Sequence, residues 1–348
     1  MEQESSAGGF TASDSNHLPV QCNTFEDELT MHQLPMQPAS QTNQSHILKQ
    51  SVLIDTDIGD DIDDALALAL ALQSPELAVK GITTVFGDTQ RRGQLAQYLL
   101  KVFEREDIPV AAGIGNPIQY HHRPSGVPQA AMIDHHLPLP ALSPLSGPEL
   151  IVETALAARG KLTLLCLGPL TNVATALSLE PRLFMAIERL VVMGGSSQYP
   201  FPEWNVRSDA RAAQIVLGAG IPVTMLGWNV TTRCQLQASD IQRLHCHHTP
   251  QTQLLSTLLA IWQRHRPRWH PALPYLHDPL TVVTLCAPEL LAFREITARV
   301  ISRGPLSGFM VPHLLNGPLV QGAVKLEAEQ AREWIMERLL APSPAQTT

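Results

Sequence analysis

Six aspartates lie within ten residues of the chain, from Asp55 to Asp64. Six carboxylates this close together cannot all be ionised without a counter-charge. A divalent cation is the simplest counter-charge, and all-oxygen ligands are typical of Ca²⁺ and Mg²⁺ sites. No histidine or cysteine lies in the stretch, so zinc is not expected there. The alternative interpretation is a solvated acidic loop whose aspartates cap a helix.

Strand-like and helix-like segments alternate from Ser51 onwards. This alternation predicts an α/β fold with an open, mostly parallel, Rossmann-like sheet flanked by helices. The expected strands are residues 52–54, 77–86, 108–111, 162–167, 190–193, 223–226, 297–302 and 322–326. The expected helices are residues 65–72, 90–103, 148–158, 170–179, 210–217 and 328–340, with two or three more within 238–287.

Residues 65–72 alternate alanine and leucine, a pattern whose period fits a strand. Alanine and leucine are strong helix formers, and Asp63 and Asp64 supply the negative charge that stabilises a helix N-terminus. We therefore interpret the segment as a buried helix. It positions the last two aspartates of the acidic stretch.

Glycine-rich or polar segments follow four of the expected strands. In open α/β sheets, ligands bind beyond the carboxyl ends of the strands. We therefore expect one rim of the sheet to carry these segments, which are residues 55–64, 87–88, 168–172 and 194–195.

The composition fits one globular domain with 44% apolar residues and a net charge of −8. The acidic balance argues against nucleic acid or a membrane surface as a partner, and no apolar run approaches the roughly 18 residues of a membrane span. Residues 1–47 are polar and are expected to form a disordered extension, 48–341 the α/β domain and 342–348 a tail. Five scattered cysteines favour a cytoplasmic location.

Four blocks of sequence, in order, resemble the inosine–uridine-preferring nucleoside hydrolases. The blocks are Asp55-Thr56-Asp57 with Asp63-Asp64-Ala65, then Gly168-Pro169-Leu170-Thr171-Asn172, then Gly194-Gly195 with Glu203-Trp204-Asn205, and finally His277-Asp278-Pro279. In the first block, two extra residues lie between Gly59 and Asp63. The resemblance covers roughly residues 51–340 and implies the fold of that family.

The resemblance implies one Ca²⁺ per subunit, held by Asp57, Asp64, Asp278 and the carbonyl oxygen of Leu167. It implies hydrolysis of a ribonucleoside to ribose and a free nucleobase, with Asp57 as the general base for a water that attacks the anomeric carbon. Carboxylates around the sugar suit this reaction because its transition state carries positive charge. His277 matches a residue that protonates the leaving base in some members, although a histidine that only packs beside the site fits as well.

The ribose would be held by residues that match family positions, namely Asp63, Asp88, Glu203, Asn205 and Asp278. The chain departs from the pattern at Asp88, where asparagine is common. It also departs in the short interval between Gly195 and Glu203, which lacks an asparagine that often holds the 5′-hydroxyl group. The cation ligands are complete, whereas recognition of the 5′ end and the base is altered.

Two alternatives to a common ribonucleoside hydrolase stay open. One is an N-ribosyl hydrolase for a modified or non-standard nucleoside, and the other is a catalytically weak, metal-bound ribose-binding protein. Related proteins form dimers or tetramers, so a homodimer or homotetramer is expected.

Several other polar residues are not expected to take part in a functional site. Arg91 and Arg92 are expected to be a solvated helix start, with a phosphate clamp as the alternative. Residues 245–248 (His-Cys-His-His) are expected to be a polar loop rather than a zinc site. His121, His122, His135 and His136 fall in a long connection near the rim and are expected to be solvated, with a role in lining the pocket as the alternative.

Overall fold

The computed structural model describes residues 49–119, 126–133, 138–268 and 270–342. All of them belong to the second of the two units into which the chain divides, His46–Thr348. The expected extension 1–47 lies outside the described residues, as do most of the tail and the four loop histidines at 121, 122, 135 and 136. The expectations for those segments stay predictions.

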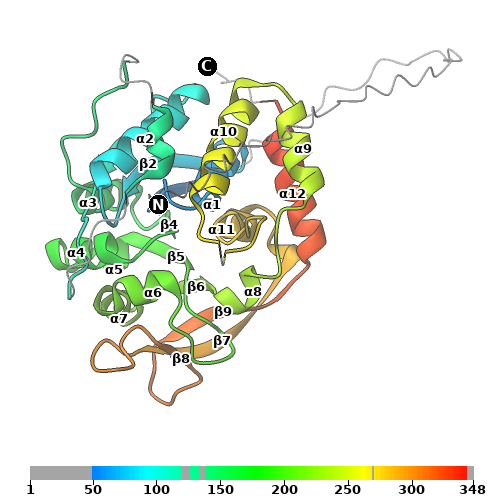
Figure 1. The fold of residues 1–348 in the computed structure, drawn as a ribbon. Coiled ribbons are helices and arrows are strands. Elements are labelled where there is room, and N and C mark those ends of the chain that lie inside the picture. The colour runs from blue at the N-terminus through cyan, green and yellow to red at the C-terminus, as the bar shows by residue number, and fades with distance from the viewer. Residues whose placement is uncertain (1–48, 120–125, 134–137, 269, 343–348) are drawn as a thin grey trace, which may run out of the picture. The chain divides into compact units, whose positions relative to one another are not determined.

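The described residues form a nine-stranded sheet with the order β3-β2-β1-β4-β5-β6-β9-β7-β8 (Figure 1). From β3 to β9 neighbouring strands are parallel, whereas β7 is antiparallel to both β9 and β8. This confirms the mostly parallel α/β fold. The strands are β1 (Gln50–Thr56), β2 (Leu77–Thr84), β3 (Val110–Ala112), β4 (Leu162–Cys166), β5 (Ile187–Met193), β6 (Val223–Leu226), β7 (Leu291–Val300), β8 (Met310–Pro312) and β9 (Leu319–Leu326).

Helices cover both faces of the sheet, and each face has its own apolar core (Figure 1). Successive residues of β1 divide between the cores, because Val52 and Ile54 join one and Leu53 joins the other. The first core is covered by α1 (Asp63–Gln73), α2 (Thr89–Val102), α9 (Ala238–Cys246), α10 (Pro250–His265), α11 (Pro279–Cys286) and α12 (Ala328–Leu340). The second is covered by α3 (Gly147–Ala158), α4 (Thr171–Leu179) and α7 (Ala210–Leu217).

Helix α1 is buried along its whole length, as its alanine and leucine content indicated. A helix that is apolar on every side belongs in a core rather than at a surface. Its first two residues are Asp63 and Asp64, so the helix carries two carboxylates into the interior at its N-terminal end.

Most of the longer predicted elements are confirmed, and α7, β6 and α12 begin and end at the predicted residues. The short helices α5 (Leu183–Ala186), α6 (Trp204–Ser208) and α8 (Trp228–Thr231) were not predicted, because four or five residues show no helical periodicity. Strand β7 begins six residues earlier than expected, since its first half carries exposed charged side chains.

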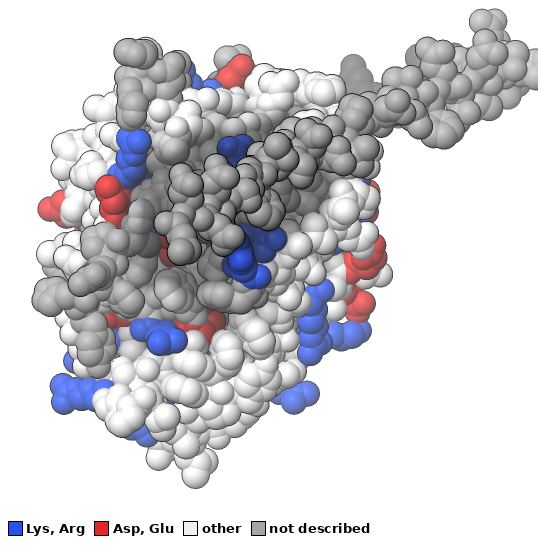
Figure 2. Space-filling model, viewed as in Figure 1, with Lys and Arg blue, Asp and Glu red and all other residues white. Residues whose placement is uncertain are grey.

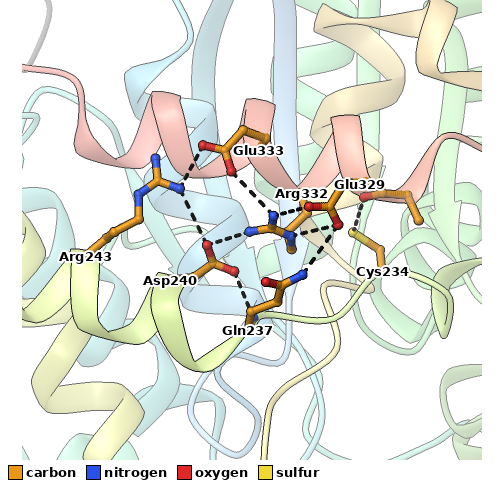
Figure 3. A network of polar contacts seen from close by, with 8 residues as sticks. Cys234, Gln237, Asp240, Arg243, Glu329, Arg332 and Glu333 are labelled. Carbon is orange, nitrogen blue, oxygen red and sulfur yellow. Dashed lines mark hydrogen bonds and ion pairs between the residues drawn. The ribbon is translucent and has the colours of Figure 1, made fainter.

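A network of ion pairs joins α9 to α12 (Figure 3). Arg332 of α12 lies 2.5 Å from Asp240 of α9, and the two side chains are only 8% and 1% exposed. Arg332 also lies 2.5 Å from Glu329, whose side chain is 72% exposed. The buried pair attaches the C-terminal helix to the rest of the fold.

We expect Asp240→Ala to lower the free energy of unfolding by about 3 kcal/mol, because it removes the buried partner of the Arg332 guanidinium and leaves only partners that are more exposed. Glu329→Gln is the matched control and should cost less than about 1 kcal/mol, since that partner is exposed. Urea denaturation of both variants measures the difference. Equal losses would show that burial does not set the strength of this network.

Candidate functional site

The order of the strands predicts a ligand-binding crevice at the carboxyl ends of β1 and β4. Chain connections run outward in opposite directions from these two neighbouring strands, and ligands bind at such a point in open α/β sheets. Beyond β1 comes the acidic loop 57–62, and beyond β4 come Leu167 and Gly168. A Cβ atom on Gly168 would lie 2.7 Å from Oδ1 of Asp57, so the ends of the two strands are in contact.

Three carboxylates meet beside this crevice. Oxygen atoms of Asp63, Asp64 and Asp278 all lie within 4.8 Å of one another, and each residue is at most 5% exposed. Asp63 and Asp64 begin α1, and Asp278 immediately precedes α11. Among the residues that the structure describes, no other group of acidic, histidine or cysteine side chains has the spacing of a metal site. Residues 245–248 therefore form no such cluster.

Burial and mutual repulsion strongly disfavour ionised carboxylates here. Burial raises the pKa of Asp63 and Asp278 well above the usual range, and neighbouring aspartates raise it further. Burial also raises the pKa of Asp64 to about 7, against the effect of a hydrogen bond from Thr56. A buried set of oxygen donors that repel one another fits a hard divalent cation, which would supply the missing positive charge.

Asp57 and Leu167 lie at the edge of this group. Burial raises the pKa of Asp57 well above its usual range, and the charge of Asp64 is the next largest cause, so these two carboxylates are close neighbours. The carbonyl oxygen of Leu167 accepts a hydrogen bond of 2.5 Å from Nδ2 of Asn205. The structure therefore brings Asp64 and Asp278 together with Asp63, and places Asp57 and Leu167 on the adjoining ends of β1 and β4.

Glu203 and Asn205 connect the ends of β4 and β5. The carboxylate of Glu203 is buried and accepts hydrogen bonds from three backbone N–H groups, those of Gly195, Asn205 and Val206, at 2.9–3.1 Å. Asn205 donates to the carbonyl oxygens of Leu167 and Met193. Both residues lie at the expected rim, and the polar atoms named here already have partners within the protein.

His277 lies directly beside the carboxylate cluster, because the next residue is Asp278. Its Nδ1 atom is 2.6 Å from Oγ1 of Thr231 in α8, and its ring centroid is 5.3 Å from that of Tyr275. Burial lowers the pKa of His277 to about 4, so the imidazole is neutral near pH 7. The threonine contact fixes the orientation of the ring.

Asp88 is not part of the cluster. Its side chain is exposed and caps α2 by accepting a hydrogen bond of 3.0 Å from the backbone N–H of Arg91. A carboxylate at this position stabilises the start of the helix.

Arg92 is the largest departure from the sequence analysis. We expected a solvated side chain, but the guanidinium is fully buried. It donates to the carbonyl oxygens of Asp57, Ile58 and Phe86 and pairs with Asp60 at 2.7 Å. No sequence pattern indicated this, because its partners are mostly backbone carbonyl groups of a loop distant in sequence.

Two further polar side chains below the rim were missed. Asn172 donates to Asp55 and to the carbonyl oxygen of Thr84 and accepts from the backbone N–H of Ile114. Asp209 accepts from Thr171 and from the backbone of Ile118. The block Gly168–Asn172 was recognised as a signal, but its role as a structural junction was not.

The described surface carries both charges, with acidic and basic side chains scattered over the face shown in Figure 2. The cluster carboxylates are buried and contribute little to that surface. The local concentration of acidic residues thus belongs to an interior site.

We expect Gly168→Ala to lower kcat/KM by about 100-fold or more, because the new methyl group would overlap the carboxylate of Asp57. Gly126→Ala is the control, since a methyl group there meets nothing within 4 Å. Steady-state kinetics on ribonucleosides, with the melting temperature of each variant, measures the effect. Full activity of Gly168→Ala would exclude a functional contact between Asp57 and the end of β4.

Comparisons with known proteins point to one enzyme family. The family model for inosine-uridine preferring nucleoside hydrolase matches residues 52–333. The chain is 36% identical over 270 residues to a pyrimidine-specific ribonucleoside hydrolase RihA of Salmonella paratyphi A, covering 73% of this chain and 85% of that protein. It is 32% identical over 324 residues to probable uridine nucleosidase 2 of Arabidopsis thaliana, covering 84% and 98%.

Solved structures show the same fold. The plant nucleoside hydrolase PpNRh1 aligns with a TM-score of 0.75 at 27% identity, covering 84% of this chain and 99% of that one. The purine-preferring ribonucleoside hydrolase from Gardnerella vaginalis aligns with a TM-score of 0.74 at 25% identity, covering 83% and 98%. None of the described helices is long and apolar enough to cross a membrane. The chain therefore belongs to the inosine-uridine preferring nucleoside hydrolase family.

Proposed function

We propose that this nucleoside hydrolase binds one Ca²⁺ through Asp57, Asp64, Asp278 and the carbonyl oxygen of Leu167, and cleaves the N-glycosidic bond of ribonucleosides beside it. The meeting of buried carboxylates at the crevice between β1 and β4 is the observation that carries this proposal. The donors are all oxygen atoms, as a hard cation requires. A cation bound there would lower the pKa of a coordinated water and fix its position.

Asp57 is the proposed general base. Its carboxylate lies at the end of β1 against Gly168, next to the cluster and less buried than Asp63, Asp64 and Asp278. Its position beside the cluster would let it reach a water held by the cation, as a general base must. Asp57 would take the proton of the attacking water.

Asp63 and Asp278 are the proposed ribose ligands within the cluster. Their carboxylates would accept hydrogen bonds from the sugar hydroxyl groups. Negative charge fixed around the sugar stabilises the positive charge that develops as the glycosidic bond breaks.

Glu203 and Asn205 are proposed to hold the sugar from the ends of β4 and β5. Each carboxylate oxygen can accept more than one hydrogen bond, so Glu203 can contact a hydroxyl group while it caps α6. Asp88 has the least structural support, because it is exposed and caps α2.

His277 is proposed to assist the leaving base. When the hydroxyl group of Thr231 donates to Nδ1, the proton of the neutral imidazole lies on Nε2. His277 would then donate a hydrogen bond through Nε2 to the departing base. The low pKa favours a neutral donor over a charged acid.

We further propose a preference for pyrimidine ribonucleosides. Its support is the naming of the two relatives above, one pyrimidine-specific and one a probable uridine nucleosidase. The cytoplasmic location and the homodimer or homotetramer expected from the sequence also stay proposals.

Chelation should abolish ribose release, and added Ca²⁺ should restore it. Asp57→Asn should lower kcat by about 100-fold or more, since a positioned base contributes at least that much. Asp107→Asn is the control, because that carboxylate is exposed and pairs with Arg105. Activity that resists chelation would refute the cation's role, whereas ribose binding without turnover would favour the binding protein.

A panel of ribonucleosides separates the substrate proposals. We expect kcat/KM for uridine and cytidine to exceed that for inosine and guanosine, measured as reducing sugar released. A purine preference would contradict the proposal. Turnover of modified nucleosides alone would support the N-ribosyl hydrolase alternative.

A further inference from the structure

The acidic loop between β1 and α1 is two residues longer than the family pattern, and Asp60, Asp61 and Ile62 separate Gly59 from Asp63. A longer loop costs more entropy to order, and this one also carries carboxylates that repel one another. Its backbone carbonyl groups nevertheless have defined partners. Two residues from distant segments, Arg92 and Gln129, supply the partners of four of these carbonyl groups.

Arg92 holds the loop from the side of α2. Its guanidinium contacts the carbonyl oxygens of Asp57 and Ile58, the latter at 2.8 Å, and the carboxylate of Asp60 at 2.7 Å. Its Nε donates at 2.7 Å to the carbonyl oxygen of Phe86, at the end of β2. One rigid, planar group therefore fixes the loop relative to the neighbouring strand.

Gln129 holds the same loop from the short 3₁₀ helix Pro128–Met132. Its backbone N–H donates to the carbonyl oxygen of Gly59 at 3.1 Å, and its side-chain Nε2 donates to that of Asp61 at 2.7 Å. Gln129 is fully buried. Gly59 has a φ of +124°, and a Cβ atom there would lie 2.2 Å from a methyl group of Val127, so the loop fits closely against this segment.

We propose that Arg92 and Gln129 are positioning residues that clamp the backbone of loop 57–62 and so preset Asp57 for the cation and the substrate. This inference rests on the proposed function. Neither side chain need touch the cation, because each acts on the backbone that carries Asp57. A preset loop removes the cost of ordering it when the cation binds.

The test compares Ca²⁺ affinity by isothermal titration calorimetry for the full chain and its variants. Arg92→Lys keeps the charge and loses the fork of donors. We expect its Ca²⁺ to bind about 10-fold or more weakly, with kcat lowered more than KM is raised. Arg105→Lys is the matched control, because that arginine pairs with Asp107 at the surface, and it should bind Ca²⁺ as the wild type does.

Gln129→Met has nearly the same volume and should weaken Ca²⁺ binding in the same direction. If Arg92→Lys does not fold, Asp60→Ser replaces it in the test, because the Asp60 side chain is partly exposed. We expect Asp60→Ser to weaken Ca²⁺ binding as well. Melting temperatures in chelator separate a general loss of stability from a loss of positioning. A lower melting temperature with unchanged Ca²⁺ affinity would overturn the clamp.

Two other outcomes are distinguishable. Absence of Ca²⁺ binding by the wild type would refute the proposed cation site itself. If Arg92→Lys binds Ca²⁺ as tightly as the wild type and only Arg92→Gln binds it more weakly, Arg92 acts by its charge alone. That result would overturn the positioning role.

Discussion

The arrangement of the elements around the crevice depends on how the protein offsets the repulsion among buried carboxylates. Burial disfavours each ionised aspartate, and its neighbours add to that cost. The protein answers with hydrogen bonds and with one buried guanidinium. Thr56 donates to Asp64, Thr83 and Asn172 donate to Asp55, and Arg92 pairs with Asp60. These contacts leave the cluster of Asp63, Asp64 and Asp278 short of positive charge, which the cation proposed at Asp64 and Asp278 would supply.

Successive side chains of β1 point to opposite faces of the sheet, so the hydrogen bonds that stabilise the carboxylates lie on both faces. Asp55 points towards Thr83 and Asn172, where burial raises its pKa to about 7. Thr56 points the other way, to Asp64 at the start of α1. The Asp-Thr-Asp sequence thus joins β2 and α4 on one face and α1 on the other, before Asp57 reaches the crevice. The pleat of the strand, as well as the chemistry of the site, therefore determines which of its side chains point to each face.

The sequence predicted what depends on local pattern and missed what depends on distant contact. The buried helix α1 followed from alanine, leucine and two N-terminal aspartates, and an acidic site at its start followed from the density of aspartates. Asp278, the third member of the cluster, followed only from the family resemblance. The burial of Arg92 could not be predicted, because carbonyl groups of loop 57–62 have no signature in sequence. The structural partners of Glu203 and Asn205 were equally hidden, since they are backbone atoms of α6 and of neighbouring strand ends.

The short segment between Gly195 and Glu203 is held in place by contacts with β8, at the edge of the sheet. Phe201 and Met310 of β8 exchange two backbone hydrogen bonds of 3.1 Å, so the segment is paired as an added piece of strand. The ring of Phe201 also stacks on Trp228, with centroids 4.5 Å apart. Ser197 is buried and donates to the carbonyl oxygen of Ala323. The backbone N–H of Trp228 also donates to the carbonyl oxygen of Gly195 at 2.9 Å, so the stacked aromatic pair is attached to the carboxyl end of β5.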